Sequence, residues 1–527
     1  MSVSFTATGS AQTGESLARA AHQVLMGSFS GPVVPTWLLR RLDAGLGAIC
    51  LFGSNLTGTQ LDTDGGPDAH VRNVTEPLLA AAPHLVIATD EEGGDVTRLD
   101  ARTGSRFPGA LALGTADDAR LTREVSAGIG RRLRAAGVRM DLAPVADVNV
   151  EADNPIIGVR SYGEEPALVA RHVAAAVTGL QSAGVAACPK HFPGHGGTRD
   201  DSHTDVPWLD VDPEVLERRE LVPFRAAVAA GTLSLMAAHI VFEALDPLQP
   251  ASTSPAVVRL LRDDLGFTGC VVSDALDMAG VSKPHGGVPN AAVAALDAGV
   301  DLLCLGSEFD DDMTGAVVAA VLRAVDDGTL PAERLFEAAG AVARLSAALA
   351  VPPTDTPDDP GAPTGDLRAS LLAASDALRV DGDLPPTAGA LVVELAVPPT
   401  IAAGVVAWDL AGALARRVPG VEQADCGPDD DVGPILARAA GRPLVAVVRD
   451  AHRHSWVGRR LAAFAAARPD LVVVETGWPG PEPLPGAARV WTRGAAAVSL
   501  EAAADLLAGA GAGATTAGAG GAAGRSR

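Results

Sequence analysis

Short, continuous apolar runs alternate with longer stretches of helical periodicity over the first 350 or so residues. The runs lie at 47–52, 85–89, 138–143, 185–189, 233–238, 270–273 and 301–305. Uninterrupted runs of this kind are typical of parallel strands that are buried on both faces. The segments between them, such as 117–136 and 164–183, carry apolar and charged residues at helical spacing. The pattern predicts a (β/α)8 barrel over residues 1–352, with a doubly wound open sheet as the competing interpretation.

A second, shorter α/β pattern follows the predicted barrel. Residues 353–367 are rich in Pro, Asp and Gly, a composition that favours a linker. Further apolar runs lie at 388–396, 443–448 and 470–475, with helical segments between them. They predict a smaller three-layer α/β sandwich domain over residues 368–507. Residues 508–527 are an Ala/Gly-rich tail with no pattern that could bury a core, and we expect it to be disordered.

Composition narrows the class of protein. Aromatic residues make up only 3% of the 527, so the core must be built from Ala, Val and Leu. A net charge of −23 argues against a nucleic-acid partner. The five cysteines are widely spaced, which favours free thiols in a reducing, cytoplasmic compartment. We expect neither a signal peptide nor a membrane span, because residues 1–28 are polar and no apolar run reaches about 20 residues.

Polar side chains follow the predicted strands at the point where each strand ends. Asp90 follows the run 85–89, Lys190 follows 185–189, and Asp274 follows 270–273. Barrel enzymes carry their chemistry at the carboxyl ends of the strands. These residues are therefore the first candidates for an active site.

The most informative segment is residues 190–203, K-H-F-P-G-H-G-G-T-R-D-D-S-H. A metal site on His191, His195 and His203 is one interpretation, but the spacing of the first two suits zinc only on a helix, which Pro193 and the glycines forbid. In the second interpretation, Asp201 orients His203 as a general acid/base. A polar surface loop is the third.

Three further motifs each allow a functional and a structural interpretation. Asp274, in C-V-V-S-D-A-L-D-M, suits a nucleophile or a helix N-cap, with Asp277 as a nearby second carboxylate. The segment 90–98, D-E-E-G-G-D-V-T-R, could bind sugar hydroxyls or a divalent cation. Arg160, in N-P-I-I-G-V-R-S-Y, could clamp a ligand or lie on the surface.

Taken together and in this order, the motifs resemble those of the β-N-acetylglucosaminidases of glycoside hydrolase family 3, over roughly residues 15–350. The resemblance implies a retaining exo-enzyme that removes terminal GlcNAc without a cofactor or metal. It implies that Asp274 is the nucleophile and that His203 is the acid/base, with Asp201 as its dyad partner. The residues that it implies for holding the sugar are Asp90, Arg98, Arg160, Lys190 and His191. Glu91 stands where the family usually has Gln.

Several alternatives stay open at this point. Inorganic phosphate could replace water as the acceptor, because a neutral imidazole does not repel an anion, and a β-glucosidase of the same family is another candidate. A metal-dependent hydrolase is disfavoured, because H-x-H occurs only at His452 and His454, and a non-catalytic glycan-binding protein is disfavoured by the full set of candidate groups. With Arg449, those histidines could reach the active site or contact the substrate, or they could form a surface turn; we favour the turn. Family and compartment together predict muropeptide fragments from peptidoglycan recycling as the substrate.

Overall fold

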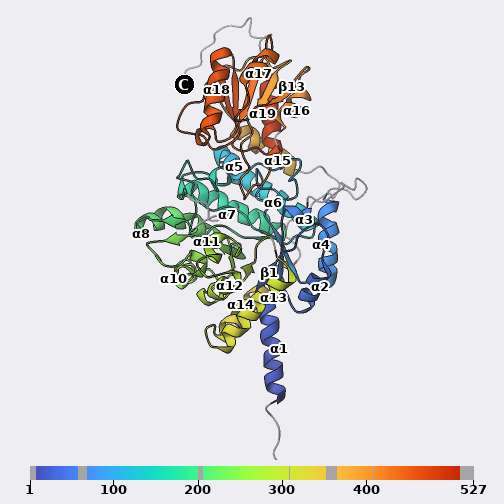
Figure 1. Cartoon of the computed structure of the whole chain (residues 1–527), viewed down its shortest axis with the longest axis vertical. Coiled ribbons are helices and arrows are strands. Elements are labelled where there is room, and N and C mark those ends of the chain that lie inside the picture. The colour runs from blue at the N-terminus through green and yellow to red at the C-terminus, as the bar shows by residue number, and fades with distance from the viewer. Residues whose placement is uncertain are drawn as a thin grey trace, which may run out of the picture.

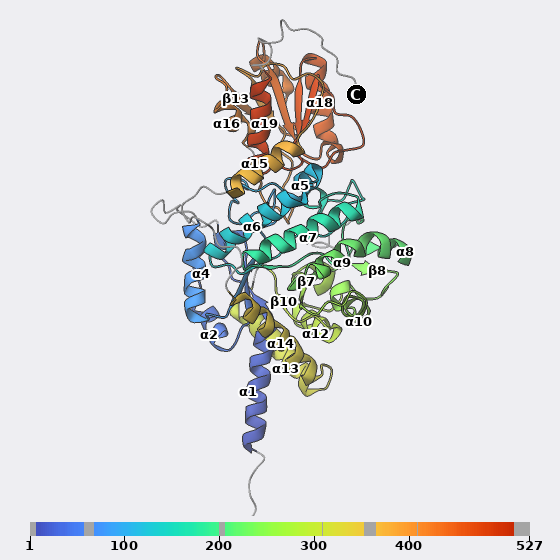
Figure 2. The same ribbon diagram turned by 180° about the vertical axis from the view of Figure 1, so that it is seen from behind.

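The computed structural model describes residues 7–56, 68–199, 206–307, 309–351, 365–407 and 409–510. A larger N-terminal domain carries a smaller C-terminal domain, and the two share one elongated outline (Figures 1 and 2). Helix α1 (Ala7–Gln23) points away from the N-terminal domain at the end opposite the C-terminal domain. None of the helices in the described ranges is both long and apolar enough to cross a membrane.

The N-terminal domain is built on a parallel barrel, as the sequence predicts. Its strands are β1 (Leu25–Gly27), β2 (Ala48–Leu51), β3 (Val86–Thr89), β4 (Met140–Asp141), β5 (Ala186–Ala187), β7 (Ser234–Ala237), β9 (Cys270–Ser273) and β10 (Leu303–Cys304). Six of them form a sheet in the order β10-β1-β2-β3-β4-β5, and β7 pairs with β9. Parallel bridges between Phe192 and Ala237 and between Val272 and Leu302 join these two sheets into a ring.

Helices follow the strands and cover the ring. They are α2 (Thr36–Asp43), α3 (Gly53–Leu56), α4 (Ala69–Ala81), α5 (Ala110–Ala116), α6 (Ala119–Ala135), α7 (Pro166–Ser182), α8 (Pro213–Val215), α9 (Leu221–Ala229), α10 (Pro255–Arg259), α11 (Ala279–Ser282), α12 (Val288–Ala298), α13 (Asp311–Asp326) and α14 (Ala332–Leu349). Short helical turns lie at Gly158–Arg160, Leu216–Glu220, Ala251–Thr253 and Leu260–Asp264, and β6 (Trp208–Leu209) pairs with β8 (Val241–Phe242). Helices α6 and α7 confirm the two helical segments predicted from periodicity.

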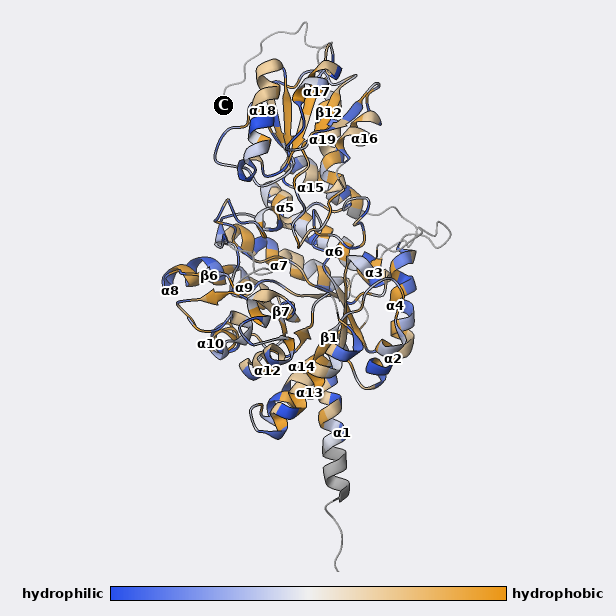
Figure 3. Ribbon diagram, viewed as in Figure 1, coloured by the Kyte–Doolittle hydropathy of each residue, from blue (hydrophilic) through white to orange (hydrophobic). Residues whose placement is uncertain are grey.

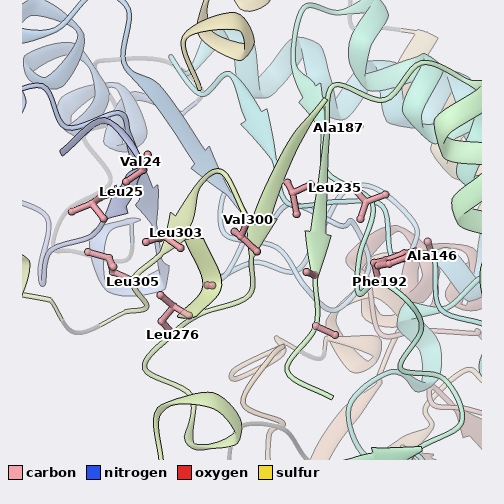
Figure 4. Packing of buried hydrophobic residues seen from close by; sticks show 14 of the residues in the cluster. Val24, Leu25, Ala146, Ala187, Phe192, Leu235, Leu276, Val300, Leu303 and Leu305 are labelled. Carbon is pink, nitrogen blue, oxygen red and sulfur yellow. The ribbon is translucent and has the colours of Figure 1, made fainter. Parts of the chain in front are cut away.

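The core is made mainly of Ala, Val and Leu side chains, as the composition predicts. Figure 4 shows part of the layer between strands and helices, where Leu25, Leu235 and Leu303 pack with their neighbours. A separate cluster of Met, Ala and Cys side chains includes Met26, Cys50, Met140, Cys188, Cys270 and Cys304. All five cysteines of the chain are free and buried. Burial of many apolar groups stabilises the barrel, and a few aromatic side chains, such as Phe192 and Phe224, are buried among the aliphatic ones.

The C-terminal domain is the predicted three-layer sandwich. Its strands are β11 (Arg379–Asp381), β12 (Leu391–Glu394), β13 (Glu422–Asp425), β14 (Leu444–Val448), β15 (Val472–Glu475) and β16 (Ala488–Trp491), in the order β11-β16-β15-β14-β12-β13. Its helices are α15 (Gly365–Ala377), α16 (Leu410–Ala415), α17 (Val432–Arg438), α18 (Ser455–Ala467) and α19 (Ala497–Gly509), with a short turn at Ala451–Arg453. Alternate residues of β12 face α16 and α19 on one side and α17 and α18 on the other. The central strands are correspondingly hydrophobic in Figure 3.

Contacts across the domain boundary place the C-terminal domain on the barrel. Helix α15 packs on α5 and α6. The guanidinium of Arg379 donates to the Thr115 carbonyl oxygen at 2.8 Å. Helix α15 begins inside the predicted linker 353–367; the part of that linker before Gly365, and the predicted tail beyond residue 510, lie outside the described residues.

Candidate active site

A pocket of about 350 Å³ opens at the carboxyl ends of the barrel strands. Its volume is within the range of small-molecule sites, roughly 300–1,000 Å³. Among the residues that line it are Asp90, Glu92, Arg98, Arg160, Lys190, His191, His195, Asp274 and Asp277. The structure therefore brings together Asp274 and all five sugar-binding residues that the sequence predicts.

Lys190 is the centre of a buried ionic network. Its Nζ lies 2.6 Å from Asp90 Oδ1 and 2.7 Å from Glu92 Oε1. Arg160 donates two hydrogen bonds to the same Glu92 carboxylate, from Nε at 2.9 Å and from Nη2 at 2.8 Å. A bidentate pair of this kind fixes both side chains. Arg160 is thus a buried part of the pocket and not a surface arginine.

The charges of this network stabilise one another. Burial opposes ionisation of Glu92, but Arg160 and Lys190 outweigh it and hold the pKa of that carboxyl well below its usual range. Burial likewise opposes the charge on Lys190, yet Asp90 and Glu92 raise the pKa of its amine. Lys190 therefore stays protonated and can fix the Asp90 carboxylate at the pocket wall.

Arg98 joins the barrel to the C-terminal domain at the rim of the pocket. Its Nη2 lies 3.8 Å from Asp90 Oδ2 and donates to the Ala402 carbonyl oxygen at 3.0 Å. Its Nε is buried and, among the described residues, has no hydrogen-bond partner. An unmet donor beside Asp90 is suited to a sugar hydroxyl.

Asp147 organises the start of the histidine loop, a role that the sequence analysis missed. Its Oδ2 lies 2.8 Å from His191 Nδ1, and its Oδ1 accepts the backbone N–H groups of His191 (3.2 Å) and His195 (2.8 Å). Asp147 is fully buried. Its only signal in the sequence is an acid within the apolar segment P-V-A-D-V, because buried carboxylates need partners.

His195 shapes the same loop from inside. Its Nδ1 lies 2.7 Å from Thr198 Oγ1, and its carbonyl oxygen accepts from Asn154 Nδ2 at 2.9 Å. Burial and the neighbouring His191 lower the pKa of His195 to about 4, so this imidazole is neutral at ordinary pH. Across the described ranges, no three His, Cys, Asp or Glu side chains are grouped as metal ligands.

Asp274 sits where β9 ends, half-buried in the pocket. Its N–H donates to the Ala237 carbonyl oxygen at 3.0 Å, and its Oδ1 accepts the N–H of Ala275 at 2.8 Å. His239 Nε2 lies 3.0 Å from the Ala275 carbonyl oxygen and supports this turn. The next helix begins only at Ala279, so the N-cap interpretation of Asp274 is wrong.

Asp277 also lines the pocket, but its carboxylate binds a neighbouring backbone group. Its Oδ2 accepts the N–H of Ser307 at 3.0 Å, and its side chain is exposed. The predicted dyad of Asp201 and His203 lies outside the described residues, which resume at Val206. The acid/base role of His203 therefore stays a prediction.

Glu91 lies beneath the pocket wall and not in it. Its Oε1 accepts the Thr97 hydroxyl at 2.6 Å, and its Oε2 accepts the N–H groups of Arg98 (2.8 Å) and Leu99 (3.0 Å). Burial, with a contribution from Asp100, raises the pKa of Glu91 to about 7. Glu91 therefore closes the 90–98 loop on itself and holds Arg98 in place.

The C-terminal domain contributes directly to the pocket, through Ile401, Ala402 and Gly404. Arg449 forms a buried ion pair with Asp95 of the barrel, whose other oxygen accepts the N–H of Ala495 at 2.8 Å. The interpretation of the Arg449–His454 segment as a surface turn is therefore wrong.

Comparison with known proteins identifies the family. The model of the glycosyl hydrolase family 3 N-terminal domain matches residues 40–345. Beta-hexosaminidase A of Pseudoalteromonas piscicida is 34% identical over 396 residues, which cover 68% of this chain and 64% of that protein. A beta-hexosaminidase of Stenotrophomonas maltophilia (strain K279a) is 36% identical over 311 residues, which cover 56% of this chain and 87% of that protein.

A solved structure extends the similarity to both domains. The family 3 β-N-acetylglucosaminidase from Paenibacillus sp. str. FPU-7 superposes with a TM-score of 0.83 at 31% identity. The superposition covers 94% of this chain and 97% of that one. With a family match over more than half of its length and the same two-domain fold, this chain belongs to glycosyl hydrolase family 3.

Proposed function

We propose that this protein is a retaining exo-β-N-acetylglucosaminidase that releases terminal GlcNAc from β-glycosides. The observation that carries the proposal is one pocket lined both by Asp274 and by the buried polar groups around Lys190. The β-hexosaminidase names of its relatives support the same activity. A pocket closed by Arg98 and the turn at Ala402 suits the end of a glycan and not its middle.

In this proposal the sugar is held by fixed charges. The carboxylate of Asp90 accepts hydrogen bonds from sugar hydroxyls, while the hydrogen bond from Lys190 Nζ keeps it oriented. Arg98 Nε donates to a further hydroxyl. His191, whose Nδ1 is taken by Asp147, presents its Nε2 to the substrate. Because these groups are already in place, little ordering is needed when the sugar binds.

The reaction proceeds in two displacements. Asp274 attacks the anomeric carbon to form a glycosyl ester, while protonated His203 gives its proton to the leaving oxygen. His203, now neutral and oriented by Asp201, takes a proton from water as water attacks the ester. The two inversions return the β-anomer of GlcNAc and restore Asp274.

Leaving-group dependence tests the assignment of His203. We expect His203→Ala to lose far more kcat/KM on alkyl β-GlcNAc glycosides than on p-nitrophenyl β-GlcNAc, because an activated phenolate needs little protonation. General acid assistance contributes roughly 10²–10⁴-fold, which sets the expected size of the difference. Equal losses on both substrates would remove His203 from the acid role. Repeating the assay in millimolar phosphate, we expect GlcNAc and not GlcNAc 1-phosphate as the product.

We further propose muropeptide fragments in the cytoplasm as the natural substrate. Free, buried cysteines support a reducing compartment. The test compares release of GlcNAc from GlcNAc-anhydro-muropeptides with release from chitobiose. A clear preference for chitobiose would contradict this choice of substrate and leave the proposed reaction intact.

A further inference from the structure

The strand order of the C-terminal sheet reverses at β12. This strand pairs in parallel with β13 on one side and with β14 on the other. The connections that leave the carboxyl ends of β12 and β14 therefore depart to opposite sides and open a crevice between them. In open α/β sheets, ligands bind at such a reversal point.

The crevice holds a pocket of about 170 Å³, separate from the sugar pocket. Glu394, the last residue of β12, lies in its lining, and so does Arg449, which follows β14. Most of the remaining wall is apolar and comes from the loop after β12: Ala396, Val397, Pro398, Pro399, Ala403, Val405 and Val406. The pocket thus combines a carboxyl group with a short apolar channel.

Glu394 has an unmet hydrogen-bonding need. Glu394 is only 8% exposed, and its Oε1 has no hydrogen-bond partner in the described part of the chain. Burial, together with the nearby carboxylates of Asp425 and Asp409, raises the pKa of Glu394 to about 7. A buried carboxyl group without a partner destabilises a fold whether it is ionised or protonated.

Arg449 does not meet this need. Its guanidinium forms the buried ion pair with Asp95 across the domain boundary, and its Nε lies 3.6 Å from Asp450 Oδ2. The positive charge of Arg449 is therefore balanced by other carboxylates. What the pocket lacks is a donor that carries positive charge and is small enough to enter.

We propose that this pocket binds a primary ammonium group on a short apolar stem, with Glu394 as its acceptor. An ammonium group carries three hydrogen-bond donors and a compact charge. The valines and prolines of the wall suit the methylene groups of the stem. A divalent cation is less suited, since the described residues hold no cluster of three metal-ligating side chains.

A single turn separates this pocket from the sugar pocket. Gly404 lines both of them, and its N–H closes the turn on the Thr400 carbonyl oxygen at 2.9 Å. The Ala402 carbonyl oxygen of the same turn accepts from Arg98. The ammonium group can therefore belong to the aglycone of a bound substrate or to a free amine. Only the first source rests on the proposed function.

The first experiment measures binding without catalysis. We expect n-butylammonium to bind the 527-residue chain saturably at about pH 8 in titration calorimetry, and n-butanol not to bind. Glu394→Gln, which keeps the side-chain volume, should weaken binding roughly tenfold or more, because a charge-assisted hydrogen bond is lost. Val405→Trp, at a position that is 80% exposed, should also weaken it by filling the channel.

The matched control is Asp383→Asn, which removes one exposed negative charge from the same domain. It should bind n-butylammonium as the unaltered protein does. If Asp383→Asn weakens binding as much as Glu394→Gln does, the effect is one of net charge and the proposal is wrong. The proposal is also wrong if n-butylammonium does not bind the unaltered protein. Because Glu394→Gln removes a buried unpaired charge, its melting temperature should not fall.

The second experiment identifies the source of the amine. It compares kcat/KM for 3-aminopropyl and 3-hydroxypropyl β-GlcNAc in the unaltered protein and in Glu394→Gln. A preference for the aminopropyl glycoside that Glu394→Gln removes supports an aglycone amine. Equal values, with n-butylammonium binding intact, support a free amine. Failure to hydrolyse p-nitrophenyl β-GlcNAc would contradict the proposed function and leave the calorimetric result standing.

Discussion

At the scale of single residues, the site is ordered by two side chains, Glu91 and Asp147, that do not line the pocket. Glu91 collects three donors from Thr97, Arg98 and Leu99, and Asp147 collects donors from the histidine loop. Each carboxylate fixes the backbone of a loop whose other side chains line the pocket. Support of this kind holds reacting groups within the narrow tolerance that catalysis requires.

Glu91 makes a prediction about stability and pH. Its pKa lies near 4.5 when unfolded and at about 7 in the fold, so the folded chain holds the proton more tightly. Stability from this group is therefore present below about pH 4.5 and is lost as the pH rises through 7. We expect Glu91→Gln to exceed the unaltered protein in unfolding free energy at pH 8 by up to about 3 kcal/mol, measured by chemical denaturation.

A glutamine can keep the same contacts, because its oxygen accepts the two N–H groups while its amide donates to the Thr97 hydroxyl. Glu76→Gln, on the exposed side of α4, is the matched control and should leave the pH dependence unchanged. Identical pH slopes for Glu91→Gln and the unaltered protein would contradict the assignment of a raised pKa.

Asp274 and Asp277 allow the nucleophile to be tested against its neighbour. We expect Asp274→Asn to lower kcat on p-nitrophenyl β-GlcNAc by several orders of magnitude, since an amide cannot form the ester. Asp277→Asn should keep most of kcat, because Asp277 holds the Ser307 backbone. A reversal of these two results would move the nucleophile to Asp277.

At the scale of elements, the barrel strands and the residues that line the pocket could be predicted from sequence because both follow one rule. Buried parallel strands appear in the sequence as continuous apolar runs, and Asp90, Lys190 and Asp274 follow directly after such runs. Strand β1 was missed, because its run is only three residues long. Strand β13 was missed because it is an edge strand with the polar sequence E-Q-A-D.

Contacts between the domains had no signal in the sequence. Asp95 and Arg449 are 354 residues apart, and the turn at Ala402 lies far along the chain from Arg98. No periodicity links two segments that meet only after both domains have folded. Such a contact had to be seen in the structure.

The Asp95–Arg449 pair predicts that the C-terminal domain holds the 90–98 loop. Arg449→Met leaves Asp95 buried without its cation, which should cost about 3–5 kcal/mol of stability by chemical denaturation. We also expect a higher KM for p-nitrophenyl β-GlcNAc, since Arg98 lies in the same loop. Asp95→Asn combined with Arg449→Met should recover part of the stability.

Arg459→Met, on the exposed face of α18, is the control for loss of one arginine from this domain. It should change neither stability nor KM. If Arg449→Met behaves like Arg459→Met, the pair does not couple the domains.

At the scale of the whole molecule, the proposed sugar pocket is formed jointly by the two domains. The barrel supplies Asp274, the proposed nucleophile, and the charged groups, while the C-terminal domain supplies one wall through the turn that ends at Gly404. The second pocket, at Glu394, lies behind that wall. The fold thus places two chemically different pockets on either side of one short turn.

The stereochemistry of the first product tests the central claim most directly. Proton NMR during the first minutes of hydrolysis of p-nitrophenyl β-GlcNAc shows which anomer of GlcNAc is released before mutarotation. Two displacements at Asp274 predict the β-anomer first, with the α-anomer growing in later. Initial release of α-GlcNAc, or no release of GlcNAc, would contradict the retaining N-acetylglucosaminidase proposed for this chain.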